Sequence, residues 1–248
     1  MDIDRLGWRA RIGVVVPAFN TTMQPELEAM RPQGVTNHVA RIMMPDGDLK
    51  SDADQEAVVR SLGADLLPSL RRVALVQPRA IVMGISIPTF WNGIAGMRAM
   101  KAELEAEAGV PVVLGAEACL AALDAVNRGR RLGIITPYQS IGDRKVRAFF
   151  EEAGYRVPAI QSVLAPKGSS IARTPIELIC TTLDTVAAAE VDVVLQVGTN
   201  LAFSDLIESE SARLGKPVLA INAACYWTAL RLAGVADKIP GYGPPLDR

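Results

Sequence analysis

The chain has 248 residues, of which 50% are hydrophobic, so it can bury a sizeable core as one large domain or two ordinary ones. Its formal net charge is -1, from 26 basic and 27 acidic residues spread along the chain, which argues against a nucleic-acid or anionic-membrane partner. The N-terminus lacks a signal-peptide pattern, and no apolar run approaches the roughly 20 residues of a membrane helix. We therefore expect a cytoplasmic protein.

Short runs rich in Val and Ile alternate with segments of helical periodicity. The predicted strands, in chain order, are 12–16, 35–43, 80–85, 110–114, 132–135, 160–164, 191–197 and 217–221. The predicted helices are 23–30, 55–76, 96–108, 116–127, 142–153, 174–189, 206–214 and 223–232. Strands that are apolar on both faces and alternate with helices predict parallel sheets covered by helices, an α/β fold.

The two halves of the chain parallel one another. Residues 11–17 (Arg-Ile-Gly-Val-Val-Val-Pro) are similar to 131–137 (Arg-Leu-Gly-Ile-Ile-Thr-Pro), and 80–86 are similar to 192–199. Each pair occupies the same ordinal strand, first and third, in its half. The pattern predicts two pseudo-symmetric, flavodoxin-like parallel-sheet halves with the active site between them.

The predicted division is discontinuous. Residues 1–116 form the first half together with a returning C-terminal segment, 222–248, and residues 117–221 form the second. Ligands of open parallel sheets bind beyond the carboxyl ends of the strands. Polar or glycine-rich turns follow the predicted strands at 17–22, 84–88, 136–140 and 198–201. Facing halves bring these turns to one cleft, where helix N-termini offer N–H groups to a small carboxylate or dicarboxylate.

Several stretches resemble one family. Residues 16–27 (Val-Pro-Ala-Phe-Asn-Thr-Thr-Met-Gln-Pro-Glu-Leu) resemble the first turn of maleate cis-trans isomerases, and 136–138 (Thr-Pro-Tyr) resemble the third turn of those enzymes and of arylmalonate decarboxylase. Residues 83–86 (Met-Gly-Ile-Ser) and 226–234, followed by Pro-Gly-Tyr-Gly at 240–243, are similar to arylmalonate decarboxylase. The chain thus resembles this branch of the aspartate/glutamate racemase superfamily over nearly its whole length.

The resemblance implies cysteine chemistry that this chain lacks. Racemases of the superfamily have two facing cysteines, maleate isomerases use a pair, and arylmalonate decarboxylase keeps only the second. Here the two positions fall on Gly84 and Gly198, while Cys119, Cys180 and Cys225 lie in helical segments and are expected to be structural thiols. Racemisation needs an acid/base on each face of a carbon, and isomerisation by addition needs a nucleophile. Neither group stands at these positions.

The anion-binding groups of the turns remain. Tyr138, Ser86 and Thr199 are the predicted catalytic donors, and Tyr138 can donate to a carboxylate or, with a lowered pKa, act as an acid. The predicted substrate-binding residues are Asn20, Gly84, Ile85, Gly198, Asn200, Ser169 and Ser170. Asn20 either caps the following helix or contacts substrate. The resemblance places the two serines in a loop that closes over substrate, although an ordinary surface turn fits equally well.

His38 is the only histidine and lies on a predicted strand. It is either a hydrogen-bonded structural residue or the one imidazole available as a proton shuttle. One histidine and no clustered carboxylates predict no metal site, and no nucleotide-binding glycine loop occurs, so we expect no cofactor.

These features predict a cofactor-independent enzyme that acts on a small carboxylate through a stabilised enolate-type intermediate. Decarboxylation is favoured because cleavage of a carbon–carboxylate bond needs mainly an apolar pocket for the departing group and an anion hole for the electrons. Water or Tyr138 would supply the final proton. The alternatives are an isomerase or racemase with a non-cysteine acid/base, a hydrolase or hydratase that positions water, and a non-catalytic carboxylate-binding protein. The sequence leaves a homo-oligomer open.

Overall fold

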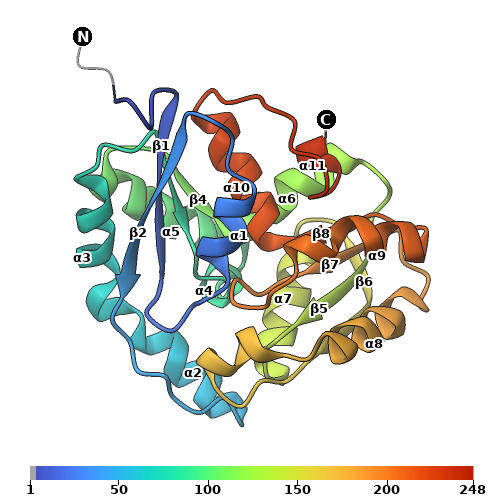
Figure 1. The fold of residues 1–248 in the computed structure, drawn as a ribbon. Helices are drawn as coiled ribbons and strands as arrows, with labels where there is room; N and C mark the ends of the chain where they lie inside the picture. The colour runs from blue at the N-terminus through green and yellow to red at the C-terminus, as the bar shows by residue number, and fades with distance from the viewer. Residues whose placement is uncertain (1–3, 248) are drawn as a thin grey trace.

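The chain forms two four-stranded parallel sheets with helices packed against them (Figure 1). In this computed structural model, which describes residues 4–247, the first sheet has the order β2-β1-β3-β4 and the second has the order β6-β5-β7-β8. The strands of the first sheet are β1 (Ala10–Pro17), β2 (Val35–Ile42), β3 (Ala80–Met83) and β4 (Val112–Leu114). Those of the second are β5 (Arg131–Thr136), β6 (Arg156–Ser162), β7 (Val193–Gln196) and β8 (Val218–Ala220). The predicted α/β fold with two pseudo-symmetric halves is confirmed.

Helices follow the strands in both halves. Before β5 the chain contains α1 (Met23–Ala29), α2 (Asp52–Ser61), α3 (Gly63–Ala74), α4 (Ile87–Phe90), α5 (Gly93–Ala108) and α6 (Gly115–Val126). The remainder contains α7 (Ser140–Glu152), the 3-10 helix η1 (Gly168–Arg173), α8 (Ile176–Ala187), the 3-10 helix η2 (Ser204–Leu206), α9 (Ile207–Leu214), α10 (Ile221–Leu232) and α11 (Pro244–Asp247). In the described part of the chain, none of these helices combines the length and hydrophobicity that a bilayer crossing requires.

The central strands are the most apolar because helices cover both of their faces. Every residue of β3 and β7 is buried, as are nearly all residues of β1 and β5. The edge strands β2 and β6 are only partly buried. The register places the carboxyl ends of β1 and β3 side by side, with Val15 opposite Met83. The turns that follow these strands therefore leave the sheet at one edge.

The largest differences from the predicted element boundaries concern one helix and one strand. A single helix over 55–76 is wrong, because α2 ends at Ser61 and α3 begins at Gly63, a residue type that is unfavourable in the interior of a longer helix. The predicted strand 160–164 begins earlier, at Arg156, where β6 pairs in parallel with β5. The short helices α4 and η1 have no apolar periodicity of their own, and the sequence did not predict them.

Aromatic packing joins the halves beneath the strand ends. Phe90 of α4 lies edge-to-face against Phe149 of α7, with ring centroids 5.1 Å apart, and Phe150 lies beside both rings. All three side chains are fully buried. From the other side, α10 packs against β3 and β4 of the first sheet and against α6 (Figure 1). The relative position of the halves is thus fixed by core packing.

Replacing Phe149 with alanine should therefore lower the free energy of unfolding by about 3–5 kcal/mol, because the cavity lies where α4 and α7 meet. Urea denaturation followed by far-ultraviolet circular dichroism measures this loss. Leu75→Ala is the matched control, since this side chain is 83% exposed and its removal should change stability by about 0.5 kcal/mol or less. A loss below about 1 kcal/mol for Phe149→Ala would contradict the assignment of this cluster as the joint between the halves.

Candidate active site

The four predicted turns converge on one cleft between the sheets. Asn20, Ser86, Tyr138 and Thr199, one from each turn, all line it. The cleft offers about 70 Å³ to the centres of water-sized molecules, and about 630 Å³ of empty space when the part open to solvent is included. The structure thus brings the chosen turns together, as expected from strands that end at facing edges.

The lining is divided by chemistry. The polar side chains are those of Asn20, Gln55, Ser86, Tyr138, Thr199 and Asn200. The apolar side chains come from the turns, the β2–α2 segment and η1, namely Pro17, Phe19, Met44, Pro45, Leu49, Val58, Leu62, Ile85, Ile87, Pro88, Pro137 and Ile171. Among residues 4–247, the Tyr138 phenol is the only ionisable side chain in this lining.

Tyr138 and Ser86 form the central contact across the cleft. Tyr138 Oη donates a hydrogen bond to Ser86 Oγ over 2.5 Å, and the Thr199 amide donates to the same oxygen over a longer 3.4 Å. Since Ser86 Oγ accepts from both, its own proton is available to a ligand. Burial raises the pKa of Tyr138 well above its ordinary value, although the bond to Ser86 opposes this. The predicted acid role with a lowered pKa is therefore wrong, and the phenol remains a neutral donor.

Thr199 holds the halves together rather than presenting a free hydroxyl. Its Oγ1 donates to the carbonyl oxygen of Gly84 over 2.9 Å, from the second half to the first. Gly84 does not line the cleft, whereas Gly198 does. The prediction of Thr199 as a hydroxyl donor to substrate is corrected, because that proton is already used within the protein.

The two glycines at the cysteine positions are closely packed. A Cβ atom on Gly84 would lie 2.5 Å from Met23 Sδ and 2.6 Å from Val16 Cγ1, and one on Gly198 would lie 2.7 Å from Pro137 Cδ. These separations are shorter than a carbon contact allows. A thiol at either position therefore requires neighbouring atoms to move.

The side-chain amides of both asparagines are bonded within the protein. Asn20 Oδ1 accepts from the amides of Thr22 and Met23 at the start of α1, and its Nδ2 donates to the Thr199 carbonyl. Asn200 Oδ1 accepts from the Thr21 amide, and its Nδ2 donates to the Gly168 carbonyl. The bonds to the Thr22 and Met23 amides are the capping role expected for Asn20, which does not exclude the expected contact with substrate. Both asparagines line the cleft, but they serve chiefly to fix its turns.

Free backbone donors remain at the strand ends. The amides of Ile85, Ser86 and Asn200 hydrogen-bond to no other group within residues 4–247, although all three residues are buried. Buried amides nearly always have a partner, so these three are suited to a ligand oxygen. Together with the Ser86 hydroxyl they form a set of neutral donors drawn from both halves.

Besides Gly84, three predicted residues lie outside the cleft lining. Ser169 donates its amide to Asp46 Oδ1, and the Ser170 hydroxyl donates to the Lys167 carbonyl, so both stabilise η1 while the adjacent Gly168 and Ile171 face the cleft. The predicted contact of these two serines with substrate is therefore replaced by a structural role.

His38 is corrected in the same way. It pairs with Gly13 four residues before β2 ends, which is roughly 13 Å along the strand from that end. Its Nε2 lies 3.0 Å from Thr36 Oγ1. The cleft lies at the strand ends and the imidazole ring does not, so His38 is not placed to act as a proton shuttle there.

Sequence reasoning missed a carboxylate that fixes the second-half turn. Glu26 of α1 accepts hydrogen bonds from the amides of Phe203 and Ser204 and from Asn222 Nδ2, at 2.7–2.9 Å. Asn222 Nδ2 also donates to the Thr199 carbonyl over 3.1 Å. An acidic residue near a helix N-terminus is common for electrostatic reasons alone, so its type gave no sign of these contacts. Its partners are distant in sequence and became visible only in the fold.

A second missed carboxylate supports Tyr138. Thr136 Oγ1 donates to Asp143 Oδ1 over 2.5 Å and accepts from the Tyr138 amide over 3.3 Å. Burial raises the pKa of Asp143 to about 6, with opposing contributions from Thr136 and Arg147. The Tyr138 backbone is further held by Ser162, whose hydroxyl donates to its carbonyl over 2.6 Å.

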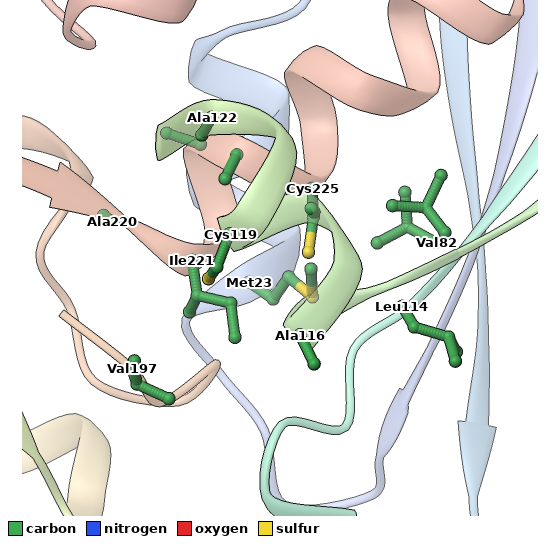
Figure 2. Close-up of a cluster of buried hydrophobic side chains, with 14 of the residues drawn as sticks. Met23, Val82, Leu114, Ala116, Cys119, Ala122, Val197, Ala220, Ile221 and Cys225 are labelled. Carbon is green, nitrogen blue, oxygen red and sulfur yellow. The ribbon is translucent and has the colours of Figure 1, made fainter. Parts of the chain in front are cut away.

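The three cysteines belong to helices and are buried or partly buried. Figure 2 shows Cys119 of α6 and Cys225 of α10 among apolar side chains that include Met23 and Ala116. Burial raises the pKa of the Cys119 thiol well above its ordinary value and that of Cys225 to about 12. The pKa of Cys180 on α8 is also raised by burial. None of the three lines the cleft.

Known proteins share this sequence pattern and fold. The family model for arylmalonate decarboxylase matches residues 12–245. A maleate isomerase from Pseudomonas putida is 26% identical over 94% of this chain and 95% of its own length. An arylmalonate decarboxylase from Bordetella bronchiseptica is 30% identical over 69% of this chain and 72% of its own length.

Solved structures agree on the fold. The maleate cis-trans isomerase of Nocardia farcinica bound to TRIS matches with a TM-score of 0.85 at 21% identity, covering 96% of this chain and 97% of that one. A crystal structure of arylmalonate decarboxylase matches with a TM-score of 0.71 at 22% identity, covering 96% and 99%. The two-sheet architecture is therefore shared by both kinds of protein.

The burial of the thiols predicts their reactivity. Iodoacetamide at pH 7.5 should leave Cys119 and Cys225 unmodified in the native protein, because thiolate formation and access are both suppressed. Peptide mass spectrometry after timed quenching measures this, and alkylation in urea, where all three thiols should react, is the control. Rapid native alkylation that a bound carboxylate prevents would show instead that a thiol faces the cleft.

The raised pKa of Asp143 predicts the pH dependence of stability. Its folded pKa of about 6 exceeds the unfolded value of about 3.9, so the fold binds this proton more tightly than the unfolded chain does. The resulting stability is fully present below pH 4 and is lost as the pH rises through 6. Asp143→Asn should therefore gain stability relative to the natural protein between pH 4 and pH 7, by up to about 3 kcal/mol for a two-unit shift. Urea titrations at several pH values measure the difference, and a constant difference contradicts the shift.

Proposed function

Because the chain belongs to the arylmalonate decarboxylase family, we propose that it decarboxylates a small dicarboxylate without a cofactor. It is an enzyme of the decarboxylase or isomerase type that its relatives represent. The choice between the two reactions rests on the chemistry of the cleft lining.

The observation that carries the proposal is the scarcity of ionisable groups. Apart from Tyr138, the cleft lining within residues 4–247 contains no side chain that titrates. The pKa of Tyr138 is raised by burial, which disfavours loss of its proton. Isomerisation through a covalent adduct needs a nucleophile such as a thiolate, and racemisation needs a base to remove a proton. Decarboxylation needs neither.

Neutral donors suffice for decarboxylation. When the carbon–carboxylate bond breaks, carbon dioxide leaves and the electron pair passes into the remaining carboxylate as an enediolate. The Ser86 hydroxyl and the free amides of Ile85, Ser86 and Asn200 would stabilise the charge that develops on its oxygens. Water then transfers a proton to the carbon and leaves hydroxide, which is balanced by hydration of the carbon dioxide to bicarbonate. No protein group needs to change its protonation state.

The apolar wall supports the same step. Met44, Leu49 and Ile171 are among the side chains that face the polar turns across the cleft. A carboxylate placed against such a surface loses hydration, whereas neutral carbon dioxide does not depend on it. The wall thus favours the departing group over the bound carboxylate.

Product analysis tests the proposal. Purified protein incubated with phenylmalonate should release carbon dioxide and phenylacetate, and in deuterium oxide the product should carry one solvent deuterium at the α-carbon. Maleate should remain unchanged. Formation of fumarate from maleate without carbon dioxide release would favour an isomerase, as in the relatives of that name, and would overturn the proposal.

The Tyr138–Ser86 pair should behave as one catalytic unit. Tyr138→Phe and Ser86→Ala should each lower kcat about 10²–10³-fold, since each weakens a donor to the developing anion. The double variant should be little worse than either single variant, because the phenol acts through the serine hydroxyl. Steady-state kinetics of carbon dioxide release measures all three.

Tyr155→Phe is the matched control for removing a phenol hydroxyl. Tyr155 donates to Asp124 and lies outside the cleft lining, so this change should leave kcat within about twofold of the natural value. The assigned roles would be contradicted if the fold-reduction in kcat of the double variant equalled the product of the two single reductions. They would also be contradicted if both single variants kept the natural kcat.

A further inference from the structure

One cleft residue differs from the other polar residues there. Gln55 lies in the first turns of α2 and is only 2% exposed, yet it lines the cleft. Its Oε1 atom is buried and has no hydrogen-bond partner within residues 4–247. Buried polar atoms normally have one, because an unpaired atom loses its hydration without compensation. The other buried side-chain atoms without a partner within residues 4–247 belong to Asn37 and Asn222, and neither of these residues lines the cleft.

The helix itself does not account for this glutamine. Val58 and Leu62 lie three and seven residues after Gln55 and also line the cleft. These spacings put all three residues on one face of the helix, which forms part of the apolar wall. The N-terminus of α2 is capped by Ser51, whose hydroxyl accepts from the Asp54 amide over 3.2 Å. Gln55 is therefore a single amide on an otherwise apolar face, and it is not needed for capping.

Contacts across the cleft hold this helix in place. Asp52, at the start of α2, accepts from the Ile141 amide over 2.8 Å and from Arg144 Nη2 over 2.9 Å, both on α7 of the second half. Just before α2, the Leu49 amide donates to the Pro166 carbonyl over 2.8 Å. Figure 1 shows α2 beside the segment that precedes α8. The Gln55 amide is thus presented to the cleft by a helix anchored to both halves.

We propose that Gln55 Oε1 accepts a hydrogen bond from a hydroxyl or amino group on the side arm of the substrate, an inference that rests on the proposed function. The neutral donors of Ser86, Ile85 and Asn200 hold the carboxylate at the strand ends. The arm then extends along the apolar face of α2 and ends in a donor at Gln55. The substrate class is a carboxylate with an apolar arm that carries a hydrogen-bond donor.

Calorimetric binding of unreactive monocarboxylates tests the inference. The probes are phenylacetate, its three ring-hydroxylated isomers and the three corresponding methoxy compounds, which cannot donate. At least one hydroxylated isomer should bind the natural protein about tenfold more tightly than phenylacetate, while its methoxy counterpart should show no such gain. In Gln55→Met, which has a side chain of similar size without an acceptor oxygen, the gain should disappear. Phenylacetate itself should bind this variant within about threefold of the natural protein.

Two further variants make the test specific. Gln55→Glu keeps an acceptor at the same place and should keep the preference for the hydroxylated probe. Arg60→Met removes a long polar side chain from the exposed surface of the same helix and should bind every probe as the natural protein does. The inference is overturned if no hydroxylated isomer binds the natural protein more tightly than phenylacetate does. It is also overturned if the higher affinity for a hydroxylated isomer persists in Gln55→Met.

The outcomes also separate this inference from the proposed function. Suppose that phenylacetate binds and Ser86→Ala weakens its binding, but no hydroxylated isomer binds more tightly than phenylacetate. The role of Gln55 is then wrong, and the carboxylate site is supported. If phenylacetate does not bind, or Ser86→Ala leaves its affinity unchanged, the carboxylate site itself falls and the inference falls with it.

Discussion

Among the hydrogen bonds that cross between the halves at the strand ends, two join the turn after β3 to the second half, and the geometry of the cleft depends on them. Tyr138 Oη donates to Ser86 Oγ, and Thr199 Oγ1 donates to the Gly84 carbonyl. Both contacts join the turn after a second-half strand to the turn after β3. Because each turn is also fixed within its own half, the two bonds set the spacing of the donors that a ligand would meet. Such a preorganised arrangement needs little rearrangement when charge develops.

The close packing of these turns leaves no space for side chains at two positions. A Cβ atom on Gly84 would collide with Met23 and one on Gly198 with Pro137, and Gly198 lines the cleft without a side chain. A cleft that holds neutral donors and a phenol of raised pKa favours stabilisation of an anion over transfer of a protein proton. This constraint connects the local packing to the proposed reaction.

Sequence patterns predicted the sheets and the turns because both follow from local rules. Buried strands are continuous apolar runs, and the functional turns follow them, so Ser86 and Tyr138 were found from their positions alone. The roles of polar side chains were harder, since Asn20 and Asn200 have the same chemistry whether they bind substrate or other turns. Glu26 was missed because the partners of its carboxylate lie 177 to 196 residues away, and Gln55 was missed because only the fold shows that it lines the cleft. Ser169, Ser170 and His38 were misplaced for the same reason: a loop or strand face does not reveal which side meets the cleft.

The central claim is that catalysis here uses hydrogen bonds from groups that do not titrate. The pH dependence of kcat for carbon dioxide release tests this most directly, since an essential acid or base would appear as an ionisation in the enzyme–substrate complex. Above the region where Asp143, with its pKa of about 6, changes its charge, the account predicts a kcat that varies by less than about twofold between pH 7 and pH 9. A kcat that changes about tenfold per pH unit anywhere in that interval would contradict it.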